Sequence, residues 1–195
     1  MQDYVKGLVK RFDYIKARRD NWDTHYQELG DYMLPRKADI VKKRSRGEKR
    51  MEQIFDGTAL QAVDLLSASL HGMLTSGASP WFHLDVKDTE LNRDDEVREW
   101  LQDTSMRMMG AFSHSNFETE IHEMYVDLVV FGTGCMFVEM DDRDLRFSTR
   151  HISEFYVQEN QFGIVDTVFR KYSLSAVAAV QTFGMENVSE HIKKV

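Results

Sequence analysis

Cysteine and proline are scarce in this chain, and long apolar runs do not occur. The 195 residues include one cysteine, Cys135, and two prolines, Pro35 and Pro80. A single cysteine excludes a disulfide within the chain and fits synthesis in a reducing compartment. The sequence has no run of about eighteen apolar residues, and its start, MQDYVKGLVKRF, lacks the apolar core and cleavage site of a signal peptide. We therefore expect a soluble, unsecreted protein that does not enter a membrane.

Signatures of catalysis and of cofactor binding are also missing. The sequence has no GxSxG, HExxH or GxxxxGK[ST] motif and no paired-carboxylate signature. The glycines of FGTG, residues 131–134, stand between a predicted helix and a predicted strand, where a turn needs them. His114, Glu118 and His122 are spaced by four, but His114 precedes the predicted start of its helix, which favours a solvated polar face over a metal site. We predict a non-enzymatic protein without a cofactor or a metal ion.

Positive charge is concentrated in one short stretch of an acidic chain. Residues 36–50, RKADIVKKRSRGEKR, contain eight basic and two acidic residues, whereas the whole chain has a formal net charge of −7. The chain therefore lacks the basic balance of a protein that coats nucleic acid along one face. Dense like charge and Gly47 predict an exposed, mobile loop. Two alternatives stay open, which are contact with an acidic neighbouring surface and contact with DNA, in either case through Lys42, Lys43, Arg44 and Arg46.

The N-terminal segment has the clearest periodicity. Its apolar residues step by three and four positions, which predicts a long amphipathic helix with a narrow apolar stripe. The stripe consists of Val5, Leu8, Phe12, Ile15, Trp22, Tyr26, Leu29 and Met33. Pro35 cannot continue a helix and disfavours helical geometry at the preceding residue, so the helix should end there. A narrow stripe packs on one neighbour. Residues 5–29 of it are therefore a candidate subunit interface, although a neighbour in the same chain fits equally well.

The middle of the chain predicts three further helices and one short strand. The second helix opens near Asp56 as N-cap and runs to residue 74, with small residues over much of its surface between residues 59 and 73. Alternation in WFHLDV predicts a strand near 80–86, with Trp81 and His83 facing away from the other apolar side chains. A third helix should span residues 94–112. A fourth should begin with a capping box formed by Ser115 and Glu118 and run to about residue 131.

The last third of the chain changes to short apolar runs separated by turn residues. Four such runs between residues 135 and 172 predict an antiparallel β meander. A short helix should follow and end at Gly184, and another should begin in ENVSEHIKKV. The expected fold class is α+β, with a mainly helical part over residues 1–134, the meander over 135–172 and a helical segment over 173–195. We expect one structural unit, and we expect the last helix to lead into a remainder beyond Val195.

Four ordered stretches of this sequence resemble the head-to-tail connecting, or portal, proteins of short-tailed bacteriophages. The most specific features are an alanine-rich helix that runs into Leu-Thr-Ser and Pro-Trp-Phe, a Ser-Asn-Phe helix start, and a hairpin of the form Asn-x-x-Gly-x-Val-Asp. The stretches are NWDTHYQELGDYMLP (21–35), IFDGTALQAVDLLSASLHGMLTSGASPWFHL (54–84), SNFETEIHEMYVDLVVFGTG (115–134) and EFYVQENQFGIVDTVFRKYSLSAVAAVQTFG (154–184). The turn SGASPW departs from the family pattern, which has proline or arginine near the positions of Gly77 and Ser79.

The resemblance implies the N-terminal, wing-type region of a structural and non-catalytic protein. Members of the family form a homo-oligomeric ring of about twelve subunits at one capsid vertex. An ATP-driven terminase threads double-stranded DNA through this ring, and capsid, scaffold and tail adaptor proteins bind it. The implied location is the virion, after assembly in the host cytoplasm, and the family's stem and clip would follow the residues present here. Two other functions stay open, namely a free-standing adaptor that binds a protein through the N-terminal helix and a small nucleic-acid-binding module that uses residues 36–50.

Overall fold

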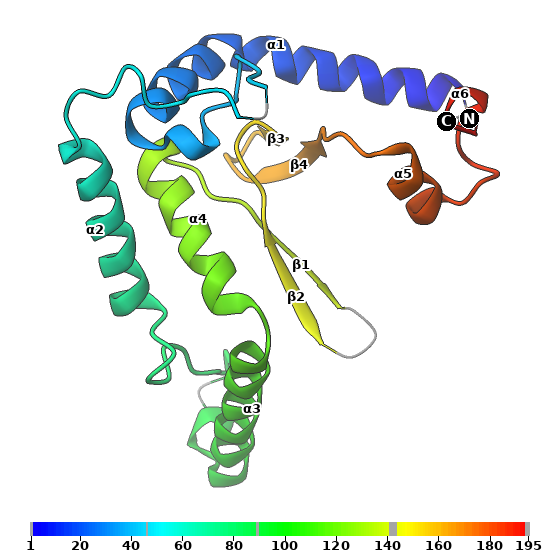
Figure 1. Cartoon of the computed structure of the whole chain (residues 1–195). Coiled ribbons are helices and arrows are strands. Elements are labelled where there is room, and N and C mark those ends of the chain that lie inside the picture. Colours follow the sequence, from blue (N-terminus) through cyan, green and yellow to red (C-terminus); the bar gives the residue numbers. More distant parts are fainter. Residues whose placement is uncertain (1, 46, 89, 141–143, 194–195) are drawn as a thin grey trace. The chain divides into compact units, whose positions relative to one another are not determined.

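The computed structural model describes residues 2–45, 47–88, 90–140 and 144–193 and confirms an α+β fold (Figure 1). Backbone contacts divide the chain into two compact units, Met1–Ser153 and Glu154–Val195. The helices of the first unit are α1 (Gln2–Met33), α2 (Thr58–Leu74), α3 (Asp95–His114) and α4 (Phe117–Phe131), with the 3₁₀ turns η1 (Pro35–Lys37) and η2 (Leu91–Arg93). Its strands are β1 (Met136–Met140) and β2 (Leu145–Thr149). The sequence-based boundaries at residues 134 and 172 stay predictions as domain limits.

Short local signals set the ends of the helices. α1 stops at Met33 because Pro35 begins the turn η1 instead of continuing the helix, as predicted. Asp94 caps α3 by accepting a hydrogen bond from the backbone N–H of Glu96. Gly132 ends α4 in the left-handed conformation, with φ of 69°, which only glycine adopts readily.

The fourth helix is the centre of the first unit. α4 packs against α1, α2, α3 and both strands of the β1–β2 hairpin, and α2 runs beside it (Figure 1). The core consists of Phe117, Ile121, Tyr125 and Phe147, with Trp81 and Phe112 among the half-buried residues around it. The ring of Trp81 stacks on that of Phe117, with centroids 5.7 Å apart and planes within 4°. Trp81 therefore faces the core, contrary to the predicted alternation.

Asn116, the residue before α4, and Glu120 in its first turn hold the free edge of strand β2. Asn116 donates a hydrogen bond from Nδ2 to the carbonyl oxygen of Phe147 over 2.8 Å and accepts one from the Phe147 N–H over 2.9 Å. The carboxylate of Glu120 accepts a hydrogen bond from the Thr149 N–H, and the backbone carbonyl oxygen of Glu120 accepts one from the Thr149 hydroxyl, both over 2.6 Å. An edge strand leaves such backbone groups unpaired, so these bonds replace a third strand. β1 and β2 thus form a separate two-stranded sheet, with Val138 opposite Phe147.

The capping box predicted at the start of α4 does not form. Ser115 lies where α3 ends, and its N–H donates to the carbonyl oxygen of Phe112, so it is not available to Glu118. The Ser115 hydroxyl accepts a hydrogen bond from the N–H of Phe117 over 3.1 Å. The carboxylate of Glu118 instead lies against Gly77, at a distance that a β-carbon on residue 77 would not permit.

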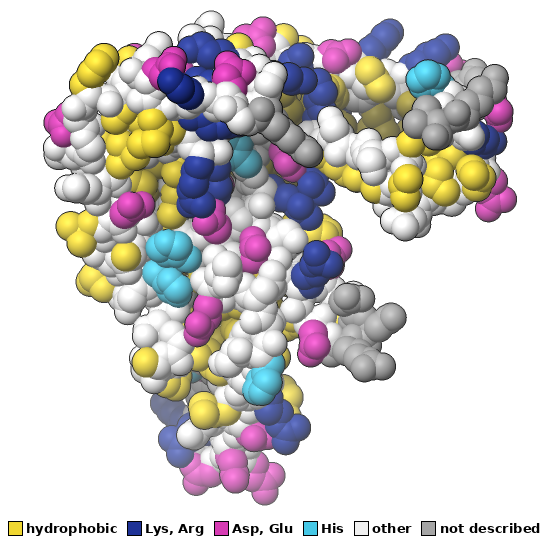
Figure 2. Space-filling model, in the orientation of Figure 1, with side chains coloured by type: hydrophobic (Ala, Val, Ile, Leu, Met, Phe, Trp, Pro, Cys, Tyr) yellow, Lys and Arg dark blue, Asp and Glu magenta, His cyan; other side chains and the backbone are white. Residues whose placement is uncertain are grey.

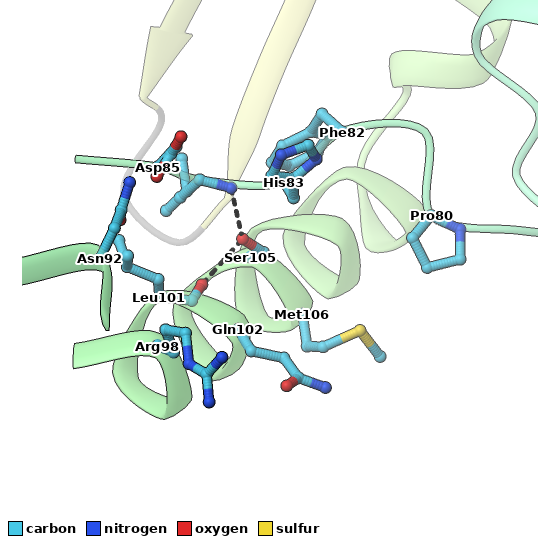
Figure 3. A pocket seen from close by; sticks show the side chains of 11 residues that line it. Pro80, Phe82, His83, Asp85, Asn92, Arg98, Leu101, Gln102, Ser105 and Met106 are labelled. Carbon is cyan, nitrogen blue, oxygen red and sulfur yellow. Dashed lines mark hydrogen bonds between the residues drawn. The ribbon is translucent and has the colours of Figure 1, made fainter. Parts of the chain in front are cut away.

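The strand predicted near residues 80–86 is also wrong. This segment is extended, but it pairs with no strand in the described part of the chain and packs along α3 instead (Figure 3). The N–H of Leu84 donates to the hydroxyl of Ser105 over 3.0 Å, and the Ser105 hydroxyl donates to the carbonyl oxygen of Leu101. Asn92 bonds both the N–H and the carbonyl oxygen of Val86. Side chains thus supply the bonds that a neighbouring strand would make, and an open hollow of about 560 Å³ lies between the segment and α3.

The second unit contains β3 (Phe155–Glu159), β4 (Val165–Arg170), α5 (Ala176–Phe183) and α6 (Glu190–Lys193). β3 and β4 pair antiparallel, with Val157 opposite Val168 and an irregularity at residues 158–159. Asn160 shapes the turn between them, because its side-chain oxygen accepts hydrogen bonds from the N–H groups of Phe162 and Ile164, and Gly163 has φ of 73°. The four predicted strands therefore exist, but they form two separate hairpins instead of one meander.

The close approach of the chain to α1 at Gly30 gives a stability prediction. A β-carbon on Gly30 would lie 3.1 Å from Cα and 3.2 Å from Cβ of Ala38, which is completely buried, whereas one on Gly7 would meet nothing within 4 Å. We expect Gly30→Ala to lower the free energy of unfolding by about 1–3 kcal/mol. Gly7→Ala, in the same helix, should raise it by up to about 1 kcal/mol. Urea unfolding followed by circular dichroism measures both, and equal gains for the two variants would contradict the close packing.

Candidate functional site

Residues 36–50, here called the basic stretch, fold back onto α1. Gln27 on α1 is buried, and its side-chain oxygen accepts hydrogen bonds from three consecutive backbone N–H groups of the stretch, those of Ile40, Val41 and Lys42, over 2.8–3.2 Å. Its amide nitrogen donates to the carbonyl oxygen of Ala38 and to a carboxylate oxygen of Asp31. One glutamine therefore fixes the path of residues 38–42. The expectation of an exposed loop was wrong for residues 38–40, which are buried or half-buried, whereas residues 41 and 42 are exposed.

Two carboxylates neutralise the middle of the basic stretch. Asp31 accepts hydrogen bonds from the guanidinium of Arg44 over 2.6 Å and from the ammonium of Lys42 over 3.1 Å. Arg44 also contacts Asp39, which pairs with Arg50 over 2.5 Å. Burial by itself would raise the pKa of Asp31, but the hydrogen bonds from Arg44 and Lys42 outweigh it and hold that pKa below its ordinary value. The same pairing raises the pKa of Arg44.

The start of the stretch is bound to α4. Lys37 donates to Asp127 over 2.9 Å and contacts Glu123 at 2.8 Å, while Arg36 contacts Glu123 at 2.9 Å. Burial raises the pKa of Asp127, which is only 1% exposed and has one carboxylate oxygen without a hydrogen-bond partner in the described structure. Burial also opposes ionisation of Glu123, but its bonds to Lys37 and Arg36 lower its pKa. The stretch thus joins the end of α1 to the middle of α4.

The candidate anion contacts fall into three groups. Arg44 is largely buried against Asp31 and Asp39, and Lys42 is exposed but paired with Asp31. Lys43 is exposed and makes no ion pair within the described residues, so it stays a candidate for contact with DNA or an acidic surface. Arg46 lies outside the described residues. Sequence reasoning missed that Asp31 of α1 comes within reach of Lys42 and Arg44, because this pairing depends on how the stretch folds back onto α1.

The apolar stripe of α1 divides into two parts. Tyr26 and Leu29 are half-buried, and the ring of Tyr26 meets the edge of Phe131 of α4, with centroids 6.0 Å apart. Trp22 stacks on Tyr26 but stays exposed. Phe12 is half-buried and Ile15 is buried, whereas Val5 and Leu8 are exposed. The stripe therefore serves the fold of its own chain near residue 26 and leaves an exposed apolar surface near its N-terminus.

Helix α2 carries a second exposed apolar surface. Its inward side contains the buried Val63 and Ser67 and packs on α4. The opposite side is formed by small and apolar residues at helical spacing, and it is here called the α2 outer face: Ala62, Leu65, Leu66, Ser69 and Met73. Leu65 is 71% exposed and Met73 is 83% exposed, and Figure 2 shows hydrophobic side chains on the surface over α2. A helix that is apolar on both sides needs a neighbour on both sides.

In the part of the chain that the structure describes, no three potential ligands from His, Cys, Asp and Glu gather in one place, and no helix is long and apolar enough to span a bilayer. His114 bonds the carbonyl oxygen of Gly110 at the end of α3. It does not share a metal-ligand cluster with Glu118 and His122 among the described residues. The side chains with shifted pKa values lie in the ion-pair network of the basic stretch, with the exceptions of Asp56 near the start of α2 and His151.

The Asp31 pairs give a second stability prediction. Asp31→Asn removes the charge that holds Lys42 and Arg44, while a control, Asp103→Asn, removes an exposed pair with Arg107 on α3. We expect Asp31→Asn to cost about 2–3 kcal/mol, because the largely buried guanidinium of Arg44 loses the nearer of its two carboxylate partners. Asp103→Asn should change stability by less than about 0.5 kcal/mol. Urea unfolding compares the two variants, and equal effects would show that the network does not hold the stretch.

His151 makes stability depend on pH. Burial, with the nearby charges of Lys37 and Arg19, lowers the pKa of His151 to about 4. The unfolded chain binds the proton first, so the contribution to stability is complete above the ordinary pKa of about 6.5 and is lost as the pH falls towards 4. Between pH 7 and pH 5 we expect a loss of about 2 kcal/mol. His151→Gln should remove most of this loss and the exposed His25→Gln none of it, as measured by urea unfolding at each pH. The same loss in both variants would contradict the assignment.

Comparison with known proteins identifies the family of this chain. Residues 5–195 match the family described as bacteriophage head to tail connecting protein. The chain is 31% identical over 192 residues to the probable portal protein of Bordetella phage BPP-1, covering 97% of this chain and 35% of that protein. It is 33% identical over 188 residues to the portal protein of Salmonella phage epsilon15, covering 95% of this chain and 34% of that protein. The chain thus spans about a third of the length of these relatives, and it belongs to the bacteriophage head to tail connecting protein family.

Proposed function

We propose that this chain is the N-terminal, wing-type part of a portal subunit. The subunits form a homo-oligomeric ring of about twelve copies at one capsid vertex, and viral DNA enters and leaves through the ring. The observation that carries this proposal is the match over nearly the whole chain to relatives named portal proteins. The role is structural and non-catalytic. The ring assembles in the host cytoplasm and stays in the virion, where terminase, capsid, scaffold and tail adaptor proteins are its partners.

A closed ring requires two different contact faces on each subunit. Each subunit of such a ring presents one surface to the copy before it and another to the copy after it. The exposed apolar residues Val5 and Leu8 of α1 and the α2 outer face supply two such surfaces. Burying a leucine or methionine side chain contributes about 1.5–3 kcal/mol, so a few of these residues are enough to favour assembly. We assign the α2 outer face to the contact between subunits.

The charges of the chain fit DNA that passes without being held. Each phosphate neutralised by lysine or arginine adds affinity, and a channel through which DNA slides must avoid this. Arg44, Arg50 and Lys37 are paired with carboxylates of the chain itself, and the net charge is −7. These pairs argue against a nucleic-acid-binding module that uses residues 36–50. A free-standing adaptor that binds through α1 differs from a portal by forming no ring.

Assembly of the ring tests the proposal. The complete reading frame that contains this chain, purified at micromolar concentration and imaged by negative-stain electron microscopy, should form closed rings of about twelve subunits. Leu66→Glu and Met73→Glu place a charge on the α2 outer face and should prevent closure, whereas Gln61→Glu, at the flank of the same helix, should not. Circular dichroism checks that each variant is folded.

The outcomes separate the parts of the proposal. Monomers or dimers of the unaltered protein would overturn the portal function and favour the adaptor. Rings that persist in both Leu66→Glu and Met73→Glu would overturn only the assignment of the α2 outer face.

A further inference from the structure

Two histidines face each other across the contact between α2 and α4. His71 lies in the last turn of α2, and His122 lies in the second turn of α4. The centroids of their rings are 5.5 Å apart, with an angle of 39° between the planes. Both side chains are partly exposed, and Figure 2 shows histidine side chains close together on the surface between α2 and α4. The pair is therefore open to ions from solvent.

The ring nitrogens of this pair are not used by the fold. Within the described residues, neither the His71 side chain nor the His122 side chain makes a hydrogen bond or an ion pair with the protein. Other histidines differ: Nδ1 of His114 bonds the carbonyl oxygen of Gly110 at 2.7 Å, and Nδ1 of His151 bonds the hydroxyl of Ser153 at 2.9 Å. A neutral imidazole has one nitrogen with a free lone pair, which is the form that binds metal ions.

The spacing of the rings fits one shared metal ion. A zinc–nitrogen bond of about 2.0–2.1 Å places the ring centroid about 3 Å from the metal, so two rings at a tetrahedral angle have centroids about 5 Å apart. The observed 5.5 Å is close to this value. The ring of Tyr125 lies 6.3 Å from that of His71, but its hydroxyl is bonded to Thr75. Glu118, one turn before His122, adds negative charge on the same side of α4.

We propose that His71 and His122 form a two-imidazole site for a divalent transition metal ion such as Zn²⁺, Ni²⁺ or Cu²⁺. Imidazole suits these ions, whereas Mg²⁺ and Ca²⁺ prefer oxygen ligands. Water completes the coordination, because no third protein ligand stands ready among the described residues. A bound ion links the end of α2 to α4 and stabilises the folded chain, since the unfolded chain does not hold the two rings together. The evidence for this site is the geometry of the two rings, and it does not rest on the portal function.

Titration of the tag-free, EDTA-treated chain with Zn²⁺ tests the site. Calorimetry should show one ion for each chain, and the melting temperature should rise with Zn²⁺ but not with Mg²⁺. His71→Asn and His122→Asn should each weaken binding by about tenfold or more. The double variant should be little weaker than either single variant, because both rings hold the same ion. His83→Asn, an exposed histidine beside α3, is the matched control and should bind as the unaltered chain does.

A spectroscopic measurement covers the case in which a variant is unstable. Electron paramagnetic resonance of the Cu²⁺-loaded unaltered chain should show coupling to two imidazole nitrogens, reduced to one in each single variant. Zn²⁺ affinity in the double variant equal to that of the unaltered chain, or coupling to fewer than two nitrogens in the unaltered chain, would overturn the proposal.

Discussion

Carboxylates on two helices hold the basic stretch in place, and the arrangement of the first unit depends on them. Asp31 on α1 binds Lys42 and Arg44, while Asp127 on α4 binds Lys37. The like charges of the basic stretch would repel one another in a free segment. Because these acids pair with them, the stretch links the end of α1 to α4. Burial of Asp127 is costly, as its raised pKa shows. Buried ion pairs of this kind often add little net stability, but breaking one leaves a charge uncompensated. The network therefore specifies the path of the chain more than it stabilises the fold.

The same pairing decides which parts of the surface remain available to partners. Cations that would attract phosphate are paired inside the chain, and Lys43 is the described member of the predicted anion contacts that has no paired carboxylate. The surfaces left open are apolar instead, near the N-terminus of α1 and on the α2 outer face. Apolar surface drives association between proteins, whereas contact with DNA depends on cations. The distribution of side chains thus favours protein partners over nucleic acid for this part of the molecule.

Features that depend on neighbouring residues could be predicted from the sequence, and features that depend on remote ones could not. Pro35 and Gly132 mark the ends of α1 and α4 because each acts on its own backbone. The alternation of residues 81–86 predicted the extended shape of this segment but not its hydrogen-bond partner, which is Ser105 of α3 and not a strand.

Ser115 and Glu118 have the spacing of a capping box, but the N–H that the box requires is bonded to the end of α3. The helix that carries the apolar stripe was predicted correctly, while the division of the stripe between the chain's own fold and an open surface depends on where Phe131 lies.

The histidine pair shows the same limit at the candidate metal site. Regular spacing in the sequence drew attention to His114 and His122, but the partner of His122 is His71 on another helix. His71 follows Ala62 by two and a half turns, so it lies on the side of α2 opposite the α2 outer face. An ion bound there would not compete with a neighbouring subunit on the outer face. It would instead restrict movement of α2 against α4 and so hold the outer face in one orientation, which lowers the entropy that association must overcome. Metal binding on the inner side of α2 and subunit association on its outer face would then be coupled through the rigidity of the helix, without any residue that belongs to both sites.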